Sequence, residues 1–187
     1  MGSVFFVSDC HFRHDKPFLY ESRGFLSIDE HDETIVENWN SIIKDDDLIY
    51  NLGDLALSDV DRAIPYIQRL KGHQIWLRGN HCSKNKIDKI LAACPKIKLV
   101  GALDTSWATI YQIGKWNFYL SHYPTKVGNY DDSKNFKWYC LCGHTHTKNK
   151  FADISDSCYH VELDAHNCYP VNLEQIKEDI RQYNLNI

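Results

Sequence analysis

Residues 3–11 read Ser-Val-Phe-Phe-Val-Ser-Asp-Cys-His, a compact apolar run that stops at a polar motif. Valine and phenylalanine in an uninterrupted run of this length predict a buried β-strand over Ser3–Ser8. The same arrangement returns twice, where apolar runs at 47–51 and 74–77 stop at Gly53-Asp54 and at Arg78-Gly79-Asn80-His81. The first half of the chain is thus expected to place polar side chains at the ends of three successive strands.

Helical patterns separate these strands. Ser27 and Glu30 form a capping box, which predicts a helix start. The apolar residues that follow recur at helical spacing: Ile35, Val36, Trp39, Ile42 and Ile43. Ser58 is expected to cap a second helix, which contains Pro65, and a third covers 84–93. Strands that alternate with helices in this way predict a parallel sheet with right-handed crossovers.

The second half of the chain is richer in strands. We expect them over 97–103, 107–113, 116–121, 138–142 and 159–163, with a tight turn at Gly114-Lys115. Asn172 is positioned to cap a last helix. Two sheets packed face to face, with helices outside, accommodate this order. The sequence contains no repeat, low-complexity tract or linker, which indicates one domain over 1–187.

The composition bears mainly on partners and location. Hydrophobic residues make up 43% and charged residues 25% of the 187 residues, as in an ordinary globular protein. The net charge of -4 disfavours a protein that wraps duplex nucleic acid, since such proteins carry a basic excess. The first apolar run is too short for a signal peptide or a membrane span, so we expect a cytoplasmic protein without membrane contact. No pattern indicates an oligomeric state.

Seven cysteines are scattered along the chain without a Cys-x-x-Cys pair, which disfavours a zinc ribbon. We interpret them as buried, reduced thiols. Cys140 and Cys142 alternate along a predicted strand and therefore face the same side of it. Packing is favoured over ligation for this pair.

Five short motifs at predicted strand ends carry the chemistry: Asp9-x-His11, Gly53-Asp54, Gly79-Asn80-His81, Ser121-His122 and Gly143-His144-x-His146. Ligand sites in open α/β sheets form at the carboxyl ends of strands, so loops from several strands can bring these side chains together. Each motif alone is weak evidence, because a single Asp-x-His pair or a lone histidine occurs in many structural settings. The joint pattern, in order and at strand ends, indicates a site.

The side chains in these motifs are oxygen and nitrogen donors, a set that suits manganese, iron, nickel or zinc. Seven donors exceed what one four-coordinate ion needs: Asp9, His11, Asp54, Asn80, His122, His144 and His146. We therefore expect two divalent ions that share a bridging carboxylate, with manganese favoured. Two such ions about 3.5–4 Å apart hold a nucleophile and a phosphate oxygen together. A hydroxide formed between them at neutral pH would attack the phosphorus.

These five motifs, in this order, resemble those of the calcineurin-like metallophosphoesterase superfamily, and the resemblance covers most of the chain. Other stretches are similar to a compact bacterial and phage branch of predicted phosphoesterases: Asn38-Trp39-Asn40, Leu120-Ser121-His122-Tyr123-Pro124 and Tyr169-Pro170-Val171. The resemblance implies a four-layer α/β/β/α sandwich.

The resemblance also implies a role for each motif residue. The first ion would be held by Asp9, His11 and His146. The second would be held by Asn80, His122 and His144. Asp54 would bridge the two ions. His81 would not be a ligand. It would lie over the phosphate, stabilise the transition state and protonate the leaving oxygen as a general acid.

One departure from the family pattern concerns the residue after Gly-Asn-His. The family usually carries Asp or Glu there, a carboxylate that orients the histidine. This chain has Cys82, and a thiol is a weak partner for that task. Either another carboxylate takes its place through space, or His81 is less well poised for catalysis.

The favoured function is hydrolysis of a small phosphoester, and phosphodiesters, nucleotide-like or cyclic, are favoured over phosphomonoesters because no insertion that would cap the site is evident. Arg13 and His14 are candidate substrate contacts, with Arg23 and Lys126 of equal standing, although a solvated loop accounts for them equally well. A nuclease acting on nucleic-acid ends is one alternative. A non-catalytic metal-binding scaffold of the same fold is another, which Cys82 favours and the full ligand set opposes.

Overall fold

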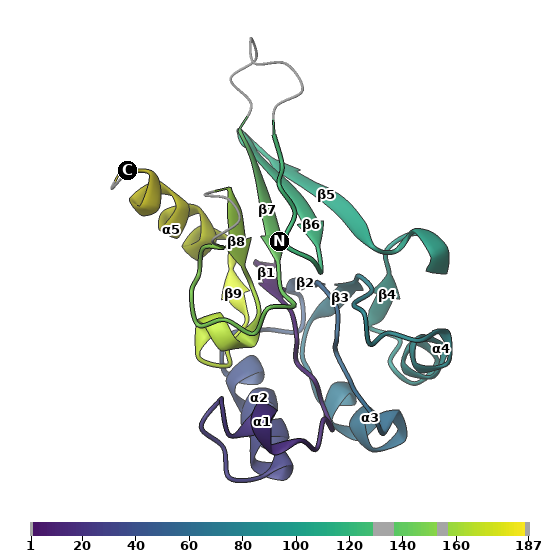
Figure 1. Cartoon of the computed structure of the whole chain (residues 1–187). Helices are drawn as coiled ribbons and strands as arrows, with labels where there is room; N and C mark the ends of the chain where they lie inside the picture. The colour runs from purple at the N-terminus through teal and green to yellow at the C-terminus, as the bar shows by residue number, and fades with distance from the viewer. Residues whose placement is uncertain (1, 129–136, 153–156, 186–187) are drawn as a thin grey trace.

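The computed structural model describes residues 2–128, 137–152 and 157–185 (Figure 1). The strands are β1 (Val4–Val7), β2 (Leu48–Asn51), β3 (His73–Trp76), β4 (Ile97–Leu99), β5 (Ala108–Ile113), β6 (Trp116–Ser121), β7 (Trp138–Cys142), β8 (Cys158–His160) and β9 (Val171–Asn172). The α-helices are α1 (Pro17–Tyr20), α2 (Ile28–Ile42), α3 (Val60–Gln68), α4 (Lys84–Ala93) and α5 (Leu173–Leu185). Two 3-10 turns lie at Leu103–Thr105 and Leu163–His166.

The first sheet has the strand order β4-β3-β2-β1-β9. Strands β1 to β4 pair in parallel, which confirms the sheet predicted from the alternation of strands and helices. Val7, Asn51 and Trp76, the last residues of β1, β2 and β3, lie in register. Since these parallel strands end level, the motifs that follow them start from the same edge. The two-residue strand β9, which the sequence did not predict, adds an antiparallel edge beside β1.

The second sheet has the order β5-β6-β7-β8 and is mixed. Strands β5 and β6 form the expected antiparallel hairpin, and Gly114 in its turn has a φ of +56°. Strands β6, β7 and β8 run parallel to one another, so the carboxyl ends of β6 and β7 also share an edge. The protein is therefore a mixed α/β fold with two sheets.

Two buried clusters fill the interior. Phe5 and Val7 of β1 face one cluster, which they share with the apolar faces of α2, α3 and α4. Phe6, between them in sequence, faces the other cluster, where it meets Phe118 of the second sheet. Helix α5 contributes to this second cluster and lies beside β8 in Figure 1. The alternation of side chains along β1 thus joins the helices on one face to the second sheet on the other.

Most predicted element ends hold to within a few residues. The Ser27 hydroxyl accepts a hydrogen bond from the Glu30 amide at 3.1 Å, and Asn172 accepts one from the Glu174 amide at 2.8 Å. The prediction for Ser58 is wrong, because Asp59 caps α3 by accepting from the Arg62 amide. The strand expected over 97–103 ends at Leu99, and a 3-10 turn follows it. No helix among the described residues is both long and apolar enough to cross a membrane.

Candidate metal centre

Backbone hydrogen bonds join the loops that follow four strands. After β1 and β2, the Asp9 amide donates to the Gly53 carbonyl at 3.1 Å and the His11 amide to the Asp54 carbonyl at 2.9 Å. After β6 and β7, the Gly143 amide donates to the His122 carbonyl at 3.0 Å. The His122 ring lies 3.0 Å, Nδ1 to oxygen, from the Leu52 carbonyl of the other sheet. The carboxyl-terminal edges of both sheets therefore meet at one place.

The first predicted donor set comes together at this edge. The ligand atoms of Asp9, His11 and His146 all lie within 4.8 Å of one another. His11 Nε2 is 3.4 Å and His146 Nε2 is 3.8 Å from Asp9 Oδ1. These separations leave room for an ion between the three side chains.

The second predicted set lies beside it. Asn80 Oδ1 is 2.8 Å from His122 Nε2 and 2.9 Å from His144 Nδ1. Asp54 Oδ2 lies 3.4 Å from the same nitrogen of His122. Ligand atoms of Asp9, Asp54 and His122 also fall within 4.8 Å of one another, so both carboxylates lie where the two sets meet. We call the seven residues Asp9, His11, Asp54, Asn80, His122, His144 and His146 the oxygen–nitrogen cluster.

Several donor atoms of the cluster are buried without a partner. Asp9 is 0% and His11 is 2% exposed. Among the described residues, neither Asp9 Oδ1 nor either ring nitrogen of His11 has a hydrogen-bond partner. Leaving buried polar atoms unpaired costs about 1–3 kcal/mol each, so native proteins rarely do so without a reason. A bound cation between these side chains would satisfy Asp9 Oδ1 and Nε2 of His11 together.

Charge is concentrated here as well. Burial alone raises the pKa of Asp9, but the nearby rings of His11, His122 and His146 hold it well below its usual range. The pKa of Asp54 is raised by burial and lowered more strongly by His122 and His11, with a net shift downward. Burial lowers the pKa of His11, which favours the neutral ring. Ionised carboxylates and a neutral imidazole are the protonation states that bind metals.

The backbone at the cluster is strained. Five of its residues have a positive φ, a region that non-glycine residues enter at a cost: Asp9 (59°), His11 (53°), Asp54 (50°), His144 (76°) and His146 (52°). A left-handed residue turns the chain abruptly after a strand. The turn aims the side chain inward, across the end of the sheet.

Two of the motif glycines fit against the carboxylates. A Cβ atom at Gly79 would lie 2.2 Å from Asp54 Oδ1, and one at Gly143 would lie 2.2 Å from Asp9 Oδ2. Either contact is far closer than real Cβ atoms approach. The conformational freedom of Gly53, with a φ of +114°, is needed in addition. The glycines therefore make room for the close approach of the acidic side chains.

Two buried acids that the sequence did not reveal support the loop of His144 and His146. Glu162 is fully buried and accepts hydrogen bonds from the amides of Thr145, His146 and Thr147 at 2.7–3.0 Å. Burial raises the pKa of Glu162 to about 7. Asp164 Oδ2 lies 3.0 Å from His146 Nδ1. Neither acid belongs to a recognisable motif, although both closely follow the last predicted strand.

Two of the candidate substrate contacts, Arg13 and Arg23, are engaged in ion pairs within the protein. Arg13 is buried, and its guanidinium is engaged with Asp29 and Asp32 of α2 rather than available to a substrate. Arg23 is equally engaged, with both Asp164 oxygens and the Asp9 carbonyl.

His14 remains near the oxygen–nitrogen cluster. Its ring centroid is 5.3 Å from that of His11, and burial, with the neighbouring His11 and His81, lowers its pKa to about 4. Lys126 is exposed on the segment after β6.

His81 and Cys82 point in different directions. His81 is exposed, and its ring centroid lies 5.8 Å from that of His11. Cys82 is buried, and its Sγ donates toward Asp54 Oδ1 at 3.6 Å, while burial raises the pKa of this thiol to about 12. Among the described residues, no carboxylate accepts a hydrogen bond from the His81 ring. The Cys82 side chain therefore contacts Asp54 rather than the His81 ring.

No protein-family model matches the chain. It is 28% identical over 182 residues to an uncharacterized protein of Methanocaldococcus jannaschii, covering 94% of this chain and 90% of that protein. The gene 66 protein of Mycobacterium phage L5 is 25% identical, with 79% of each chain covered. Its counterpart in phage D29 is 26% identical, with 97% of this chain and 99% of that protein covered.

Among solved structures, a protein of unknown function from Aquifex aeolicus superimposes with a TM-score of 0.71 at 20% sequence identity. The superposition covers 95% of this chain and 99% of that one. At this level of identity the likeness concerns the fold alone. The chain therefore shares its mixed α/β fold with the Aquifex protein.

Proposed function

We propose that the protein is a metal-dependent phosphoesterase of the calcineurin-like metallophosphoesterase superfamily. The observation that carries the proposal is the convergence of seven oxygen and nitrogen donors, from loops after five strands, around buried atoms that lack a partner. The similarity to two phage proteins is in keeping with the compact bacterial and phage branch. The four-layer α/β/β/α arrangement belongs to this proposal, beyond the two sheets and helices described above.

The donor set fits two divalent ions. Asp9, His11 and His146 would hold one ion, Asn80, His122 and His144 the other, and Asp54 would bridge them. Imidazole, amide and carboxylate ligands suit manganese, iron, nickel or zinc, of which we favour manganese. When bound, the ions would supply Lewis-acid activation of water and neutralisation of phosphate charge.

The remaining chemistry falls to residues around the ions. Asp164 and Glu162 hold His146 and its loop in place, which limits the reorganisation needed when a substrate binds. His81 lies exposed beside His11, in a position to meet a phosphate oxygen and to give a proton to the leaving group. His14 also lies beside His11, with 5.3 Å between the ring centroids, and would contact the same substrate.

The substrate class follows from the access to His81. Asn80 and His81 are exposed, and His144 and His146 are also reachable from solvent. An open site of this kind accepts a phosphate with two ester substituents, which favours phosphodiesters over monoesters. Small nucleotide-like or cyclic diesters suit a net charge of -4 better than long nucleic acids do.

The test is hydrolysis of bis-p-nitrophenyl phosphate and p-nitrophenyl phosphate by chelator-treated protein, after addition of manganese, nickel, zinc or magnesium. We expect metal-dependent turnover that is faster on the diester. Turnover on the monoester alone would overturn the substrate class. Metal binding at the oxygen–nitrogen cluster without hydrolysis of any activated ester would favour the scaffold alternative, which the missing carboxylate partner of His81 supports.

A further inference from the structure

A second group of donors lies on the outer face of the second sheet. Cys140 and Cys142 occupy alternate positions of β7, and Cys158 and His160 occupy alternate positions of β8. The two strands are parallel, with Cys140 opposite Cys158 and Cys142 opposite His160. Four donor side chains therefore form two facing pairs on one side of the sheet, away from the cluster around Phe6.

The donor atoms converge. The three sulfur atoms lie within 4.8 Å of one another, and Cys142 Sγ is 3.3 Å from Cys158 Sγ. His160 Nδ1 lies 3.8 Å from Cys142 Sγ, and it is also 3.3 Å from Thr145 Oγ1 and 3.5 Å from Glu162 Oε1. In a tetrahedral site with metal–sulfur bonds of about 2.3 Å, neighbouring sulfurs are about 3.8 Å apart. The Cys142–Cys158 separation of 3.3 Å is about 0.5 Å shorter than this value, and the other two sulfur pairs lie within 4.8 Å.

Burial excludes water from the group. The three cysteines are 0% exposed and His160 is 2% exposed. Tyr119, Val127 and Ala152 pack against the sulfurs as partly buried neighbours. Isolated buried cysteines need no explanation beyond packing. Three sulfurs within 4.8 Å of one another, with His160 Nδ1 3.8 Å from one of them, form a more specific arrangement, with the donor types of a structural zinc site.

We propose that Cys140, Cys142, Cys158 and His160 bind one zinc or similarly thiophilic metal ion, at a site separate from the oxygen–nitrogen cluster. Thiolate ligands favour zinc and other soft ions over manganese, the ion that we favour for the oxygen–nitrogen cluster. The ion would tie β7 to β8 directly behind the loop of His144 and His146, since only Gly143 separates Cys142 from that loop. Its role is therefore to fix the position of this loop.

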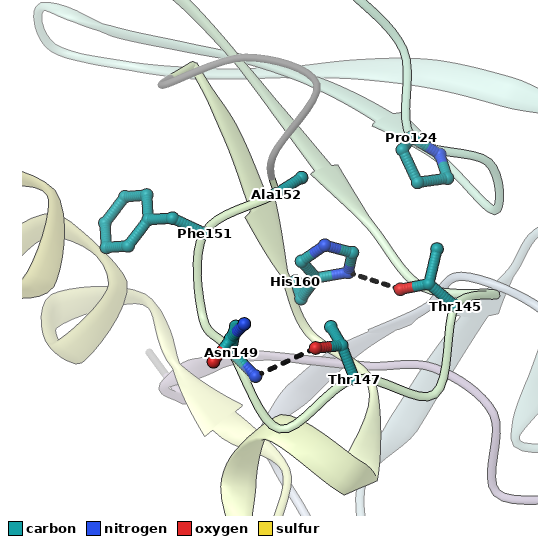
Figure 2. Close-up of a pocket in the computed structure, with 7 residues that line it drawn as sticks. All are labelled: Pro124, Thr145, Thr147, Asn149, Phe151, Ala152 and His160. Atoms are coloured by element: carbon teal, nitrogen blue, oxygen red, sulfur yellow. Dashed lines mark hydrogen bonds between the residues drawn. The ribbon is translucent and has the colours of Figure 1, made fainter.

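The nearby pocket is consistent with this arrangement. Figure 2 shows His160 between the loop residues Thr145 and Thr147 and the segment that carries Phe151 and Ala152. The pocket has a volume of about 320 Å³. His160 lines this pocket, whereas none of the three cysteines does.

The test is titration of reduced, chelator-treated full-length protein with cobalt(II), followed by optical absorption. Thiolate ligation gives a charge-transfer band in the near ultraviolet and intense visible bands, whereas oxygen and nitrogen ligation gives only weak visible bands. We expect the thiolate band in the wild type, its loss in Cys140→Ser and in Cys158→Ser, and its retention in Cys94→Ser. Cys94 is a matched control, because it is buried and lies outside the group.

The Asp54→Asn variant separates the two sites. It is expected to keep the thiolate band, whatever becomes of hydrolysis. Absence of the band in wild-type protein would overturn the proposal and needs no variant to fold. Persistence of the band in the Cys140→Ser/Cys158→Ser double variant would overturn it as well. So would a Cys142–Cys158 disulfide in protein isolated without any retained metal.

Discussion

Two donor clusters lie on either side of Gly143, and they are built in opposite ways. The oxygen–nitrogen cluster sits on loops, with five residues in the left-handed region and with buried atoms that have no partner in the described part of the chain. The cysteine–histidine group (Cys140, Cys142, Cys158 and His160) sits within regular strands, and the register of these strands alone brings it together. The difference indicates that strain is concentrated where we propose chemistry, and that the second group is a fixed structural feature.

The largest effect is expected at Asp54, the proposed bridging carboxylate. Asp54→Asn keeps the size of the side chain but removes the charge between the two donor sets. We expect turnover of bis-p-nitrophenyl phosphate to fall by on the order of 10³-fold or more, a loss of about 4 kcal/mol of transition-state stabilisation. Asp61→Asn, at an exposed carboxylate paired with Lys89, is the control and should keep its activity. Equal activity in both variants would remove Asp54 from the site.

A second test concerns the proton donor. His81→Ala is expected to lower kcat about 10²–10⁴-fold, because it removes a general acid and leaves the ligands in place. The content of bound manganese, measured on the same sample, should not change. His73 is exposed at the amino end of β3, the strand that precedes His81, and His73→Ala is the matched control. A variant that loses manganese together with activity would make His81 a ligand instead.

A third test addresses the close packing of a glycine. Gly143→Ala places a methyl group against Asp9 and Ser8, and overpacking of this kind costs about 1–3 kcal/mol of unfolding free energy. For a chain of this length each kcal/mol lowers Tm by about 2–4 °C. Gly128→Ala, where a Cβ atom meets nothing within 4 Å, should leave Tm unchanged. Thermal unfolding of both variants decides the matter.

The smallest expected effect concerns a supporting residue. Asp164→Asn weakens the hold on His146 and on Arg23, so the affinity for manganese should fall about 10–100-fold while turnover at saturating manganese changes less. Manganese titration at two substrate concentrations separates these effects. If manganese affinity were unchanged and only stability fell, Asp164 would have a structural role alone.

The grouping of the oxygen–nitrogen cluster could be predicted because each of its residues closely follows a strand. Asp9, Asp54 and Asn80 come within a few residues of apolar runs, and parallel strands bring their ends to one edge. The cysteine–histidine group could not be predicted in the same way. Cys140 and Cys142 are seen to share a face, but their pairing with Cys158 depends on the register of two strands far apart in the chain.

The supporting acids were also out of reach of sequence reasoning. Glu162 acts through three backbone amides, and Asp164 through one ring nitrogen, so neither leaves a motif. The Arg13 side chain turns toward Asp32 of α2, and the Cys82 side chain turns toward Asp54. Local sequence does not reveal either partner. The edge strand β9 has only two residues, too few for a periodic signal.

The central claim is that the oxygen–nitrogen cluster binds divalent ions and uses them in hydrolysis. The most direct measurement removes all metal with a chelator, returns manganese stepwise, and records bound manganese and diester turnover on the same samples. The account predicts no turnover without metal, and activity that rises as two manganese ions per chain bind. Turnover that survives complete metal removal, or manganese binding that Asp54→Asn leaves intact, would contradict it.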